Sequence, residues 1–210
     1  MYSQNNEDDL IAKYFEHHAN GRLLSIGEND GRTFSNALLL IEKGWYAVLV
    51  EPAPDAYGKL MMLHLDNPRV QPIQAAIAET EGRAVLHRNG AHLPAGTDTD
   101  LLSTLIPEER ERWGPYVWFR EDEVSTITFA ALQRLVGGRH YNFISIDAEG
   151  MDLAIMRQLG DELAHVDVFC IEWNSIDAVK REILGYCRGW GLTEVLCETP
   201  ENIVLTRGRR

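Results

Sequence analysis

Cysteine is scarce in this 210-residue sequence, and the three cysteines, Cys170, Cys187 and Cys197, form no CxxC pair. An odd number of thiols without such spacing is not typical of a disulfide framework. The histidines also lack the HxxxH and HxH spacings of zinc sites. We therefore interpret the cysteines as reduced thiols in the core and find no support for zinc.

Long apolar runs and a basic leader are absent as well. No stretch approaches the 18 apolar residues of a membrane-spanning helix. Residues 1–9 are polar and acidic, where a secretory signal needs basic residues followed by an apolar run. We therefore expect a soluble protein located in the cytoplasm.

Basic residues are too few to balance the acidic ones. The chain has 20 lysines and arginines against 32 aspartates and glutamates, which gives a formal net charge of −12. Such a charge repels phosphate backbones and anionic membrane surfaces. The sequence therefore predicts neither a nucleic acid nor a membrane as a partner.

The hydrophobic pattern that is present is typical of an α/β protein. Composition is that of an ordinary globular chain, and no shift in it marks a boundary within residues 1–210, so we expect one domain. Apolar runs of strand length alternate with stretches of helical periodicity, which indicates parallel strands joined by crossover helices. Strands are predicted at residues 23–26, 46–50, 70–74, 142–146, 166–171, 192–196 and 202–206. Helices are predicted at residues 4–15, 34–41, 54–65, 128–136, 151–159 and 175–187.

Two parts of the chain depart from simple alternation. The last two predicted strands are separated only by residues 197–201, a link that suits an antiparallel hairpin. Between about residues 88 and 120, glycines and prolines punctuate polar sequence. This pattern predicts an irregular segment, either a lid or substrate insertion or a plain insertion. Residues 83–87 either extend the sheet or form a side hairpin.

The turn after the first predicted strand, Gly27 to Gly31, has a glycine at each end. Glycines adopt positive φ at no steric cost and allow a ligand to approach the backbone closely. Glu51 closes the second predicted strand, where a carboxylate can accept hydrogen bonds from both hydroxyls of a ribose. Because ligands of open α/β sheets bind beyond the carboxyl ends of the strands, the turn and the acid together predict a nucleoside site.

Charges in this turn favour one nucleoside cofactor over another. The NAD fingerprint places closely spaced glycines against a pyrophosphate, whereas Glu28 and Asp30 occupy the turn in this sequence. Two carboxylates repel a pyrophosphate, but they are compatible with the cationic sulfonium and α-amino groups of S-adenosylmethionine. The sequence therefore favours S-adenosylmethionine, with an NAD-dependent oxidoreductase as a less favoured alternative.

Several motifs follow one another along most of the chain. They are Tyr2-Ser3-Gln4 with Glu7-Asp8, Ser25 to Gly31 with Ser35-Asn36, Gly44-Trp45 with Val50-Glu51-Pro52, Leu102 to Leu105, Ile144 to Asp152, and Ile171 to Asn174. In this order they resemble the FkbM-like methyltransferases, class I enzymes that are chiefly O-methyltransferases. The resemblance implies a Rossmann-like class I methyltransferase fold, a three-layer αβα sandwich with a mostly parallel seven-stranded sheet and an antiparallel terminal hairpin.

The expected cofactor contacts lie at the ends of the first three predicted strands. S-adenosylmethionine is expected to contact Gly27, Glu28, Asn29, Asp30, Gly31, Glu51, Pro52 and Ala76. The sequence departs from the usual methyltransferase pattern at Ser25, where an acid is common, at Glu28, where alanine is commoner, and at Thr104, the second residue of a serine pair. The departures at Ser25 and Thr104 motivate a rival hypothesis, a non-catalytic methyltransferase-like module that binds cofactor or partner.

Four oxygen-bearing side chains, Asp147, Glu149, Glu172 and Asn174, follow the fourth and fifth predicted strands. Adjacent strands bring them to one edge of the pocket, where loss of a hydroxyl proton must be assisted. Asp147 and Glu149 are the catalytic candidates, and Ser103, Glu172 and Asn174 are expected to bind substrate. Asp147, Glu172 and Asn174 are also possible Mg²⁺ ligands. A purely structural role, such as capping the next helix, stays an alternative.

Other side chains complete the set of hypotheses. His140 is a second-choice base, and Trp113, Trp118 and Phe119 offer an aromatic platform for a sugar or anchor a loop to the core. The leading hypothesis is an S-adenosylmethionine-dependent O-methyltransferase that acts on a small molecule or glycan. Sugar, polyketide and lipid acceptors stay open, as does the oligomeric state.

Overall fold

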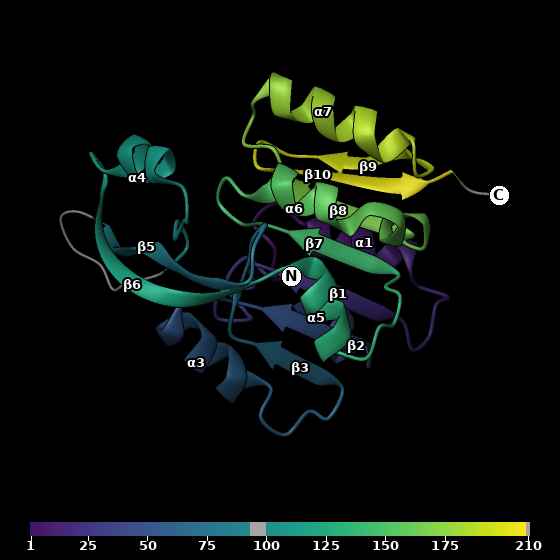
Figure 1. Ribbon diagram of the computed structural model, residues 1–210. Coiled ribbons are helices and arrows are strands. Elements are labelled where there is room, and N and C mark those ends of the chain that lie inside the picture. The colour runs from purple at the N-terminus through teal and green to yellow at the C-terminus, as the bar shows by residue number, and fades with distance from the viewer. Residues whose placement is uncertain (93–99, 209–210) are drawn as a thin grey trace.

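The computed structural model describes residues 1–92 and 100–208, and one sheet forms its centre. Its strands are β1 (Arg22–Ile26), β2 (Tyr46–Val50), β3 (Val70–Ile73), β7 (Phe143–Ile146), β8 (Val168–Glu172), β9 (Leu192–Glu198) and β10 (Asn202–Arg207). They lie in the order β3-β2-β1-β7-β8-β10-β9 (Figure 1). The first five are parallel, whereas β10 is inserted between β8 and β9 and runs antiparallel to both. The predicted mostly parallel sheet with its antiparallel terminal pair is confirmed.

The central strands of the sheet are buried on both faces. In β1, the neighbours Leu23 and Leu24 are both inaccessible to solvent, yet they belong to two different hydrophobic clusters. Phe143 and Ile144 of β7 divide between the same two clusters. Successive side chains of a strand point to opposite faces, so each face needs its own cover.

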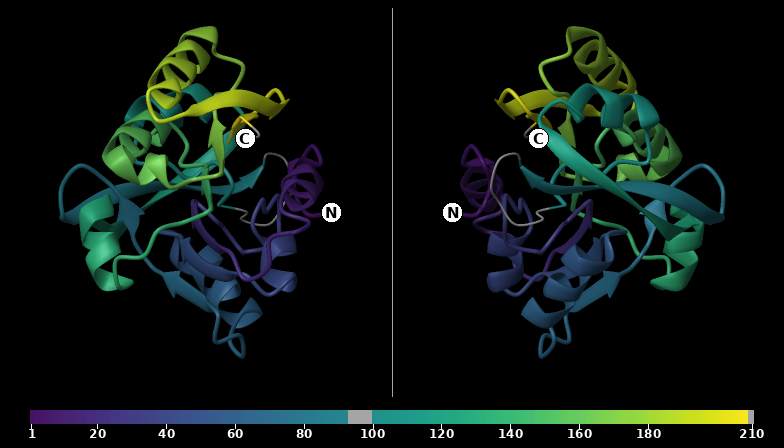
Figure 2. Two further views of the ribbon diagram at one scale, coloured as in Figure 1. Left: turned by 90° about the vertical axis from the view of Figure 1, so that its right-hand side faces the viewer. Right: turned by 90° about the vertical axis from the view of Figure 1, so that its left-hand side faces the viewer.

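Helices supply this cover (Figure 2). On one side lie α1 (Glu7–Tyr14) and α2 (Leu38–Glu42), and on the other lie α5 (Phe129–Leu135) and α6 (Asp152–Leu159). Three further helices are α3 (Pro54–Leu63), α7 (Asp177–Arg188) and the short 3₁₀ helix η1 (Gly160–Ala164). Across the described ranges, no helix has the length and apolar character that crossing a bilayer requires.

Helix α2 begins four residues later than the predicted span of 34–41. Phe34 adopts a left-handed conformation with φ of 57°, which the interior of a right-handed helix does not accommodate. The Ser35 hydroxyl then accepts hydrogen bonds from the backbone N–H groups of Ala37 at 3.1 Å and Leu38 at 2.9 Å. These contacts satisfy the free donors at the start of the helix and fix where it begins.

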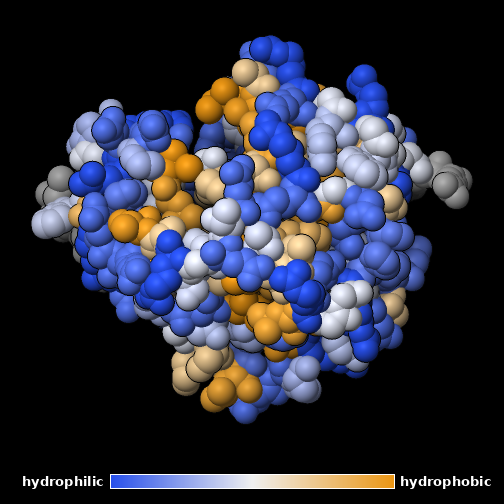
Figure 3. All heavy atoms as spheres, in the orientation of Figure 1, coloured by the Kyte–Doolittle hydropathy of each residue, from blue (hydrophilic) through white to orange (hydrophobic). Residues whose placement is uncertain are grey.

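A second, smaller sheet stands to one side of the main sheet (Figure 1). It contains β4 (Ala76–Ile77), β5 (Gly82–His92) and β6 (Val117–Ile127) in the order β4-β6-β5, and α4 (Pro107–Trp113) lies between β5 and β6 in the chain. We call β5, α4 and β6 the arm. Figure 3 shows hydrophobic residues on the arm beside the notch that separates it from the main body.

An irregular segment was expected near residues 88–120, but much of it forms the regular elements of the arm. Of this segment, the end of β5, all of α4 and the start of β6 are regular, while residues 93–99 lie outside the described residues. Pro107 occupies the first turn of α4 and Gly114 follows its last residue, so these residues mark the ends of a helix. Of the two alternatives for residues 83–87, the side hairpin is observed, because β5 pairs antiparallel with β6.

Hydrogen bonds and ion pairs of Arg88 link the arm to the rest of the molecule. Its guanidinium binds Asp100 through two hydrogen bonds of 2.8 and 2.7 Å, and both side chains are only 3% exposed. The same group donates to Asp122 of β6 at 2.6 Å and to Asp55 of α3 at 2.9 Å. A single buried cation thus joins β5, α3 and the segment that begins at Asp100.

Replacing this cation tests how strongly the arm depends on it. In Arg88→Met, Asp100 stays buried without its partner, and we expect the free energy of unfolding to fall by about 3–5 kcal/mol. Urea denaturation followed by circular dichroism measures the change. The control Arg120→Met removes an exposed contact to Asp55 and should cost less than about 1 kcal/mol. Equal losses in the two variants would contradict the assignment.

Candidate functional site

A cavity of about 510 Å³ opens at the carboxyl ends of β1, β2, β7 and β8. Its size falls within the range of small-molecule sites. Of the predicted site residues, those that line it are Gly27, Glu28, Asn29, Glu51, Pro52, Ala76, Ser103, Asp147, Glu149, Glu172 and Asn174. The fold therefore brings most of the predicted cofactor and acceptor residues to one hollow.

Two predicted cofactor residues, Asp30 and Gly31, do not line the cavity. The Asp30 carboxylate accepts hydrogen bonds from the backbone N–H groups of Arg32 at 2.9 Å and Thr33 at 2.7 Å, so it closes its own turn. A Cβ on Gly31 would meet the Leu60 side chain of α3 at 2.5 Å. Both residues shape the turn from outside the cavity.

Gly27 is required for a reason that differs from the expected one. Its φ is +81°, and a Cβ there would lie 1.7 Å from the backbone carbonyl oxygen of Asp147. The turn after β1 thus packs directly on the turn after β7, and any side chain would separate them. The group that approaches Gly27 closely is therefore the backbone of Asp147, and not a ligand.

Glu51 is held at the end of β2 by two backbone donors. One carboxylate oxygen accepts from the N–H of Asn29 at 2.9 Å, and the other accepts from the N–H of Ala53 at 2.8 Å. Each oxygen keeps a second lone pair for another donor. Burial, against the effect of these hydrogen bonds, raises the pKa of Glu51 to about 7.

Glu28 is a second buried acid on the same side of the cavity. The Ser35 hydroxyl donates to its carboxylate at 2.5 Å. Burial raises the pKa of Glu28 to about 7, although hydrogen bonds from Ser25 and Ser35 oppose the shift. Ser25, which replaces the acid common at this position, therefore supports the acid at Glu28.

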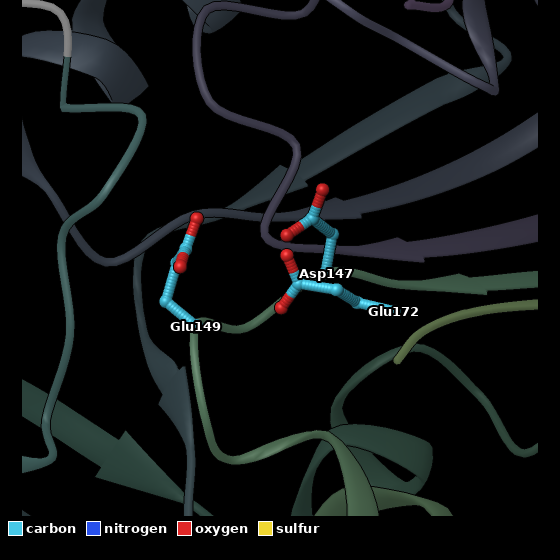
Figure 4. Close-up of side chains that lie close together, drawn as sticks. All are labelled: Asp147, Glu149 and Glu172. Carbon is cyan, nitrogen blue, oxygen red and sulfur yellow. The ribbon is translucent and has the colours of Figure 1, made fainter. Parts of the chain in front are cut away.

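Three more carboxylates, from Asp147, Glu149 and Glu172, converge across the cavity. Their ligand oxygens all lie within 4.8 Å of one another. Figure 4 shows Asp147 and Glu149 reaching inward from the loop after β7, and Glu172 from the end of β8. We call these three residues the acid cluster.

The loop that carries Asp147 and Glu149 is held rigidly. Asp152 at the start of α6 accepts hydrogen bonds from the N–H groups of Ala148 at 2.9 Å and Gly150 at 3.1 Å. The Thr104 hydroxyl donates to the Glu149 carbonyl at 2.6 Å, which ties the loop to the segment after the arm's first strand. Thr104, the departure from the serine pair, keeps the hydroxyl that this contact needs.

Burial and mutual proximity raise the pKa values of the acid cluster. Burial, reinforced by the neighbouring carboxylates, raises the pKa of Asp147 to about 7 and the pKa values of Glu149 and Glu172 well above their usual range. Asn174 hydrogen-bonds to Glu172. Of the predicted metal ligands Asp147, Glu172 and Asn174, the first two belong to the cluster, and Glu149 joins them. Such a group holds protons or a cation.

Sequence reasoning missed two buried amides that line the cavity, Asn36 and Asn202. Their side-chain oxygens have no hydrogen-bond partner among the residues that the structure describes. Asn36 stands in a quoted motif, but nothing in the sequence marks Asn202. Other candidates divide between the cavity and its outside: Trp113 lines it, whereas His140 pairs with Glu162 elsewhere.

Comparison with known proteins places the chain among methyltransferases. A family model described as a methyltransferase FkbM domain matches residues 25–188. No curated protein matches the sequence. The METTL16 MTase domain is similar in structure, with a TM-score of 0.54 and 8% identity over 97% of this chain and 67% of that chain. Precorrin-6y C5,15-methyltransferase from Geobacter metallireducens GS-15 has a TM-score of 0.48 and 12% identity over 99% of this chain and 90% of that chain. Such likeness concerns the fold, and the predicted Rossmann-like class I methyltransferase fold is confirmed.

The raised pKa values of the buried carboxyl groups predict how stability changes with pH. Native Glu28, Glu51 and Asp147 keep protons up to about pH 7, whereas the unfolded chain releases them near pH 4. Since the native state binds more protons over this interval, the free energy of unfolding should fall as pH rises from about 5 to about 8. Urea denaturation at several pH values measures the slope.

A substitution within the acid cluster should reduce this slope. In Asp147→Asn one titrating charge is lost, so the free energy of unfolding at pH 8 should exceed that of the unaltered protein by on the order of 2 kcal/mol. The control Asp161→Asn, at an exposed position of η1, should follow the original slope. A parallel slope for Asp147→Asn would show that Asp147 does not titrate as described.

Proposed function

The chain belongs to the FkbM methyltransferase family, and from this membership we propose that it transfers a methyl group from S-adenosylmethionine to a hydroxyl of a small molecule or glycan. S-adenosylmethionine is the usual cofactor of the family. One observation carries the proposal for this chain: Glu51 is a buried carboxylate that lines the cavity at the end of β2.

The residues present fit this cofactor. The free lone pairs of Glu51 can accept hydrogen bonds from the two hydroxyls of a ribose, and Asn29 and Pro52 lie beside it in the cavity wall. Glu28 lies on the same side, where a carboxylate stabilises cationic groups. When bound, the cofactor supplies an electrophilic methyl group on its sulfonium. Gly27, Glu28, Asn29, Glu51, Pro52 and Ala76 are the residues we propose to hold it.

The acid cluster supplies the base. Transfer to a hydroxyl oxygen requires that the oxygen lose its proton, and a base works best when its pKa is near the operating pH. The pKa of Asp147 is raised to about 7, and that of Glu149 is also raised. We propose that Asp147 or Glu149 takes the proton, and that Glu172, Asn174 and Ser103 orient the acceptor.

The charge of the cavity wall restricts the acceptor. Among the described lining residues, the acids are Glu28, Glu51, Asp100, Asp147, Glu149, Glu172 and Glu201, and the only basic side chain is Arg112. A polyanion pays a large electrostatic cost to enter such a cavity. We therefore propose a neutral acceptor and not a nucleic acid.

The arm closes the acceptor side of the cavity. Leu102 and Ser103 line it from the segment before α4, and Trp113 lines it from α4 itself. Because main sheet and arm share one cavity, we propose that they form a single functional domain with the arm as the substrate insertion.

A divalent cation is the second candidate for assisting proton loss. The convergence of Asp147, Glu149 and Glu172 favours it, since carboxylate oxygens are ligands that Mg²⁺ prefers. A metal at this position lowers the pKa of a hydroxyl. A module that binds cofactor without turnover is the remaining alternative, and turnover of any hydroxylated acceptor would exclude it.

Removing the proposed ribose contact should weaken cofactor binding. In Glu51→Ala two charge-assisted hydrogen bonds are lost, and we expect the dissociation constant for S-adenosylhomocysteine to rise by about 100-fold. Calorimetric titration measures it, with circular dichroism to confirm folding and Glu51→Gln as a milder change. The control Glu123→Ala lies on an exposed part of β6 and should bind normally. Unchanged affinity in Glu51→Ala would remove the ribose assignment.

Removing divalent cations with a chelator distinguishes a carboxylate base from metal-assisted loss of the proton. If Asp147 or Glu149 acts as the base, methyl transfer should survive dialysis against EDTA, and Glu149→Gln or Asp147→Asn should lower kcat by about 100-fold or more. Initial rates of S-adenosylhomocysteine formation measure both effects. Activity lost to EDTA and restored by Mg²⁺ would instead support the second candidate.

A further inference from the structure

The N-terminal motif, Tyr2 to Asp8, has no role in the cofactor site, yet its residues reach the cavity. Gln4 lines the cavity directly. Asp8 holds the preceding residues in place, because its carboxylate accepts from the Ser3 hydroxyl at 2.6 Å and from the Tyr2 N–H at 2.7 Å. The segment before α1 is therefore held in a fixed position and contributes Gln4 to the cavity wall.

Glu7, the first residue of α1, contacts Asn202 at the start of β10. Glu7 is fully buried, and its carboxylate accepts from the Asn5 N–H at 2.8 Å, the Thr199 hydroxyl at 3.2 Å and the Asn202 side-chain N–H at 3.4 Å. Although burial opposes it, hydrogen bonds from backbone donors and from Asn5 lower the pKa of Glu7. Glu7 is therefore a carboxylate at neutral pH, and it only accepts hydrogen bonds.

This contact decides which way the Asn202 amide points. Since Glu7 cannot donate, Asn202 must turn its NH₂ group toward Glu7 and its Oδ1 atom away. Asn202 lines the cavity and is 5% exposed, and its Oδ1 has no hydrogen-bond partner within residues 1–92 and 100–208. A buried acceptor left unpaired costs about 1–3 kcal/mol unless a ligand supplies a donor.

Asn202 lies beside the acid cluster. Its Cα is paired with that of Glu172 across the antiparallel strands β8 and β10, which places the two side chains on the same face of the sheet. Asn36 donates to the Cys170 sulfur at 3.6 Å, and Cys170 precedes Glu172 by two residues, on that same face. Asn36 Oδ1 is also buried and unpaired among the described residues. Asn202 and Asn36 thus both lie against β8, within two residues of Glu172, and within the described ranges each has an unpaired amide oxygen.

The chemistry of this wall matches a ligand with several hydroxyl groups. Amide oxygens need hydrogen-bond donors, and hydroxyl groups supply them. Trp113 adds a ring to the cavity wall, and its indole N–H has no acceptor in the described part of the chain. Amides, carboxyl groups and an aromatic ring together suit a sugar ring.

We propose that Asn202 Oδ1, oriented by Glu7, accepts a hydrogen bond from a hydroxyl group of a neutral carbohydrate acceptor. Glu7 is a positioning residue, and the N-terminal segment is part of the acceptor site. The inference rests on the proposed methyltransferase function, because it assigns the acceptor half of the same cavity.

Binding of simple sugars tests the proposal without turnover. The protein is first titrated with S-adenosylhomocysteine, and the saturated protein is then titrated with the methyl glycosides of glucose, galactose, mannose and rhamnose, followed by saturation-transfer NMR. At least one glycoside should bind, and Asn202→Ala should weaken that binding about tenfold with unchanged S-adenosylhomocysteine affinity. The control Asn142→Ala loses a similar amide contact, to Asp167, away from the cavity, and should bind both ligands normally.

Each outcome has a distinct meaning. Absence of S-adenosylhomocysteine binding would defeat the proposed function itself. Binding of S-adenosylhomocysteine without any glycoside, or equal glycoside binding by Asn202→Ala, would overturn the carbohydrate site alone.

A double-mutant cycle separates positioning from general structural support. In Glu7→Gln the new amide can donate to Asn202, so the Asn202 side chain can turn over, and glycoside binding should weaken about fivefold or more. In the Asn202→Ala background the same substitution should have no further effect, because no oxygen is left to orient. An equal loss in both backgrounds would show that Glu7 does not act through Asn202.

Discussion

Burial of like charges at one edge of the sheet is the constraint on which the site depends. Glu28, Glu51 and the acid cluster share one cavity, and their pKa values are raised chiefly because they are removed from water. Hydrogen bonds hold the carboxylates of Glu28 and Glu51, and among the described lining residues Arg112 is the only basic one. A cationic ligand relieves the repulsion, so the same arrangement that costs stability provides binding energy.

The surrounding structure holds these groups in place. Gly27 allows the turn after β1 to pack on the carbonyl of Asp147, and Asp152 closes the loop that follows. Arg88, outside the cavity, compensates the buried Asp100 and anchors the arm. The buried basic side chain of Arg88 thus links β5 to α3 and β6, whereas most charged side chains that line the cavity are acidic.

The sequence predicted β1, β2, β7 and β8 because these strands are buried on both faces and are nearly continuous apolar runs. A side hairpin at residues 83–87 was among the alternatives, but β6 was not predicted, because this strand mixes buried and exposed positions and carries a charged stretch. At the site, Glu51 and Asp147 were identifiable as acids that end strands. The sequence did not show that Asp30, unlike these acids, lies outside the cavity. Hydrogen bonds within its own turn hold the Asp30 carboxylate there. Asn202 depends on Glu7, a residue 195 positions away, which only the folded chain brings near.

Binding of a cationic cofactor beside the buried carboxyl groups should change the number of protons that the protein holds. If the cavity takes the cationic sulfonium beside carboxyl groups with pKa values near 7, binding lowers those pKa values and releases protons. Calorimetric titration near pH 6.5, in two buffers of different ionisation enthalpy, measures the release. S-adenosylmethionine should bind with a larger proton release than S-adenosylhomocysteine, whose sulfur is an uncharged thioether. Absence of binding, or identical proton release for the two ligands, would contradict this placement of the cofactor.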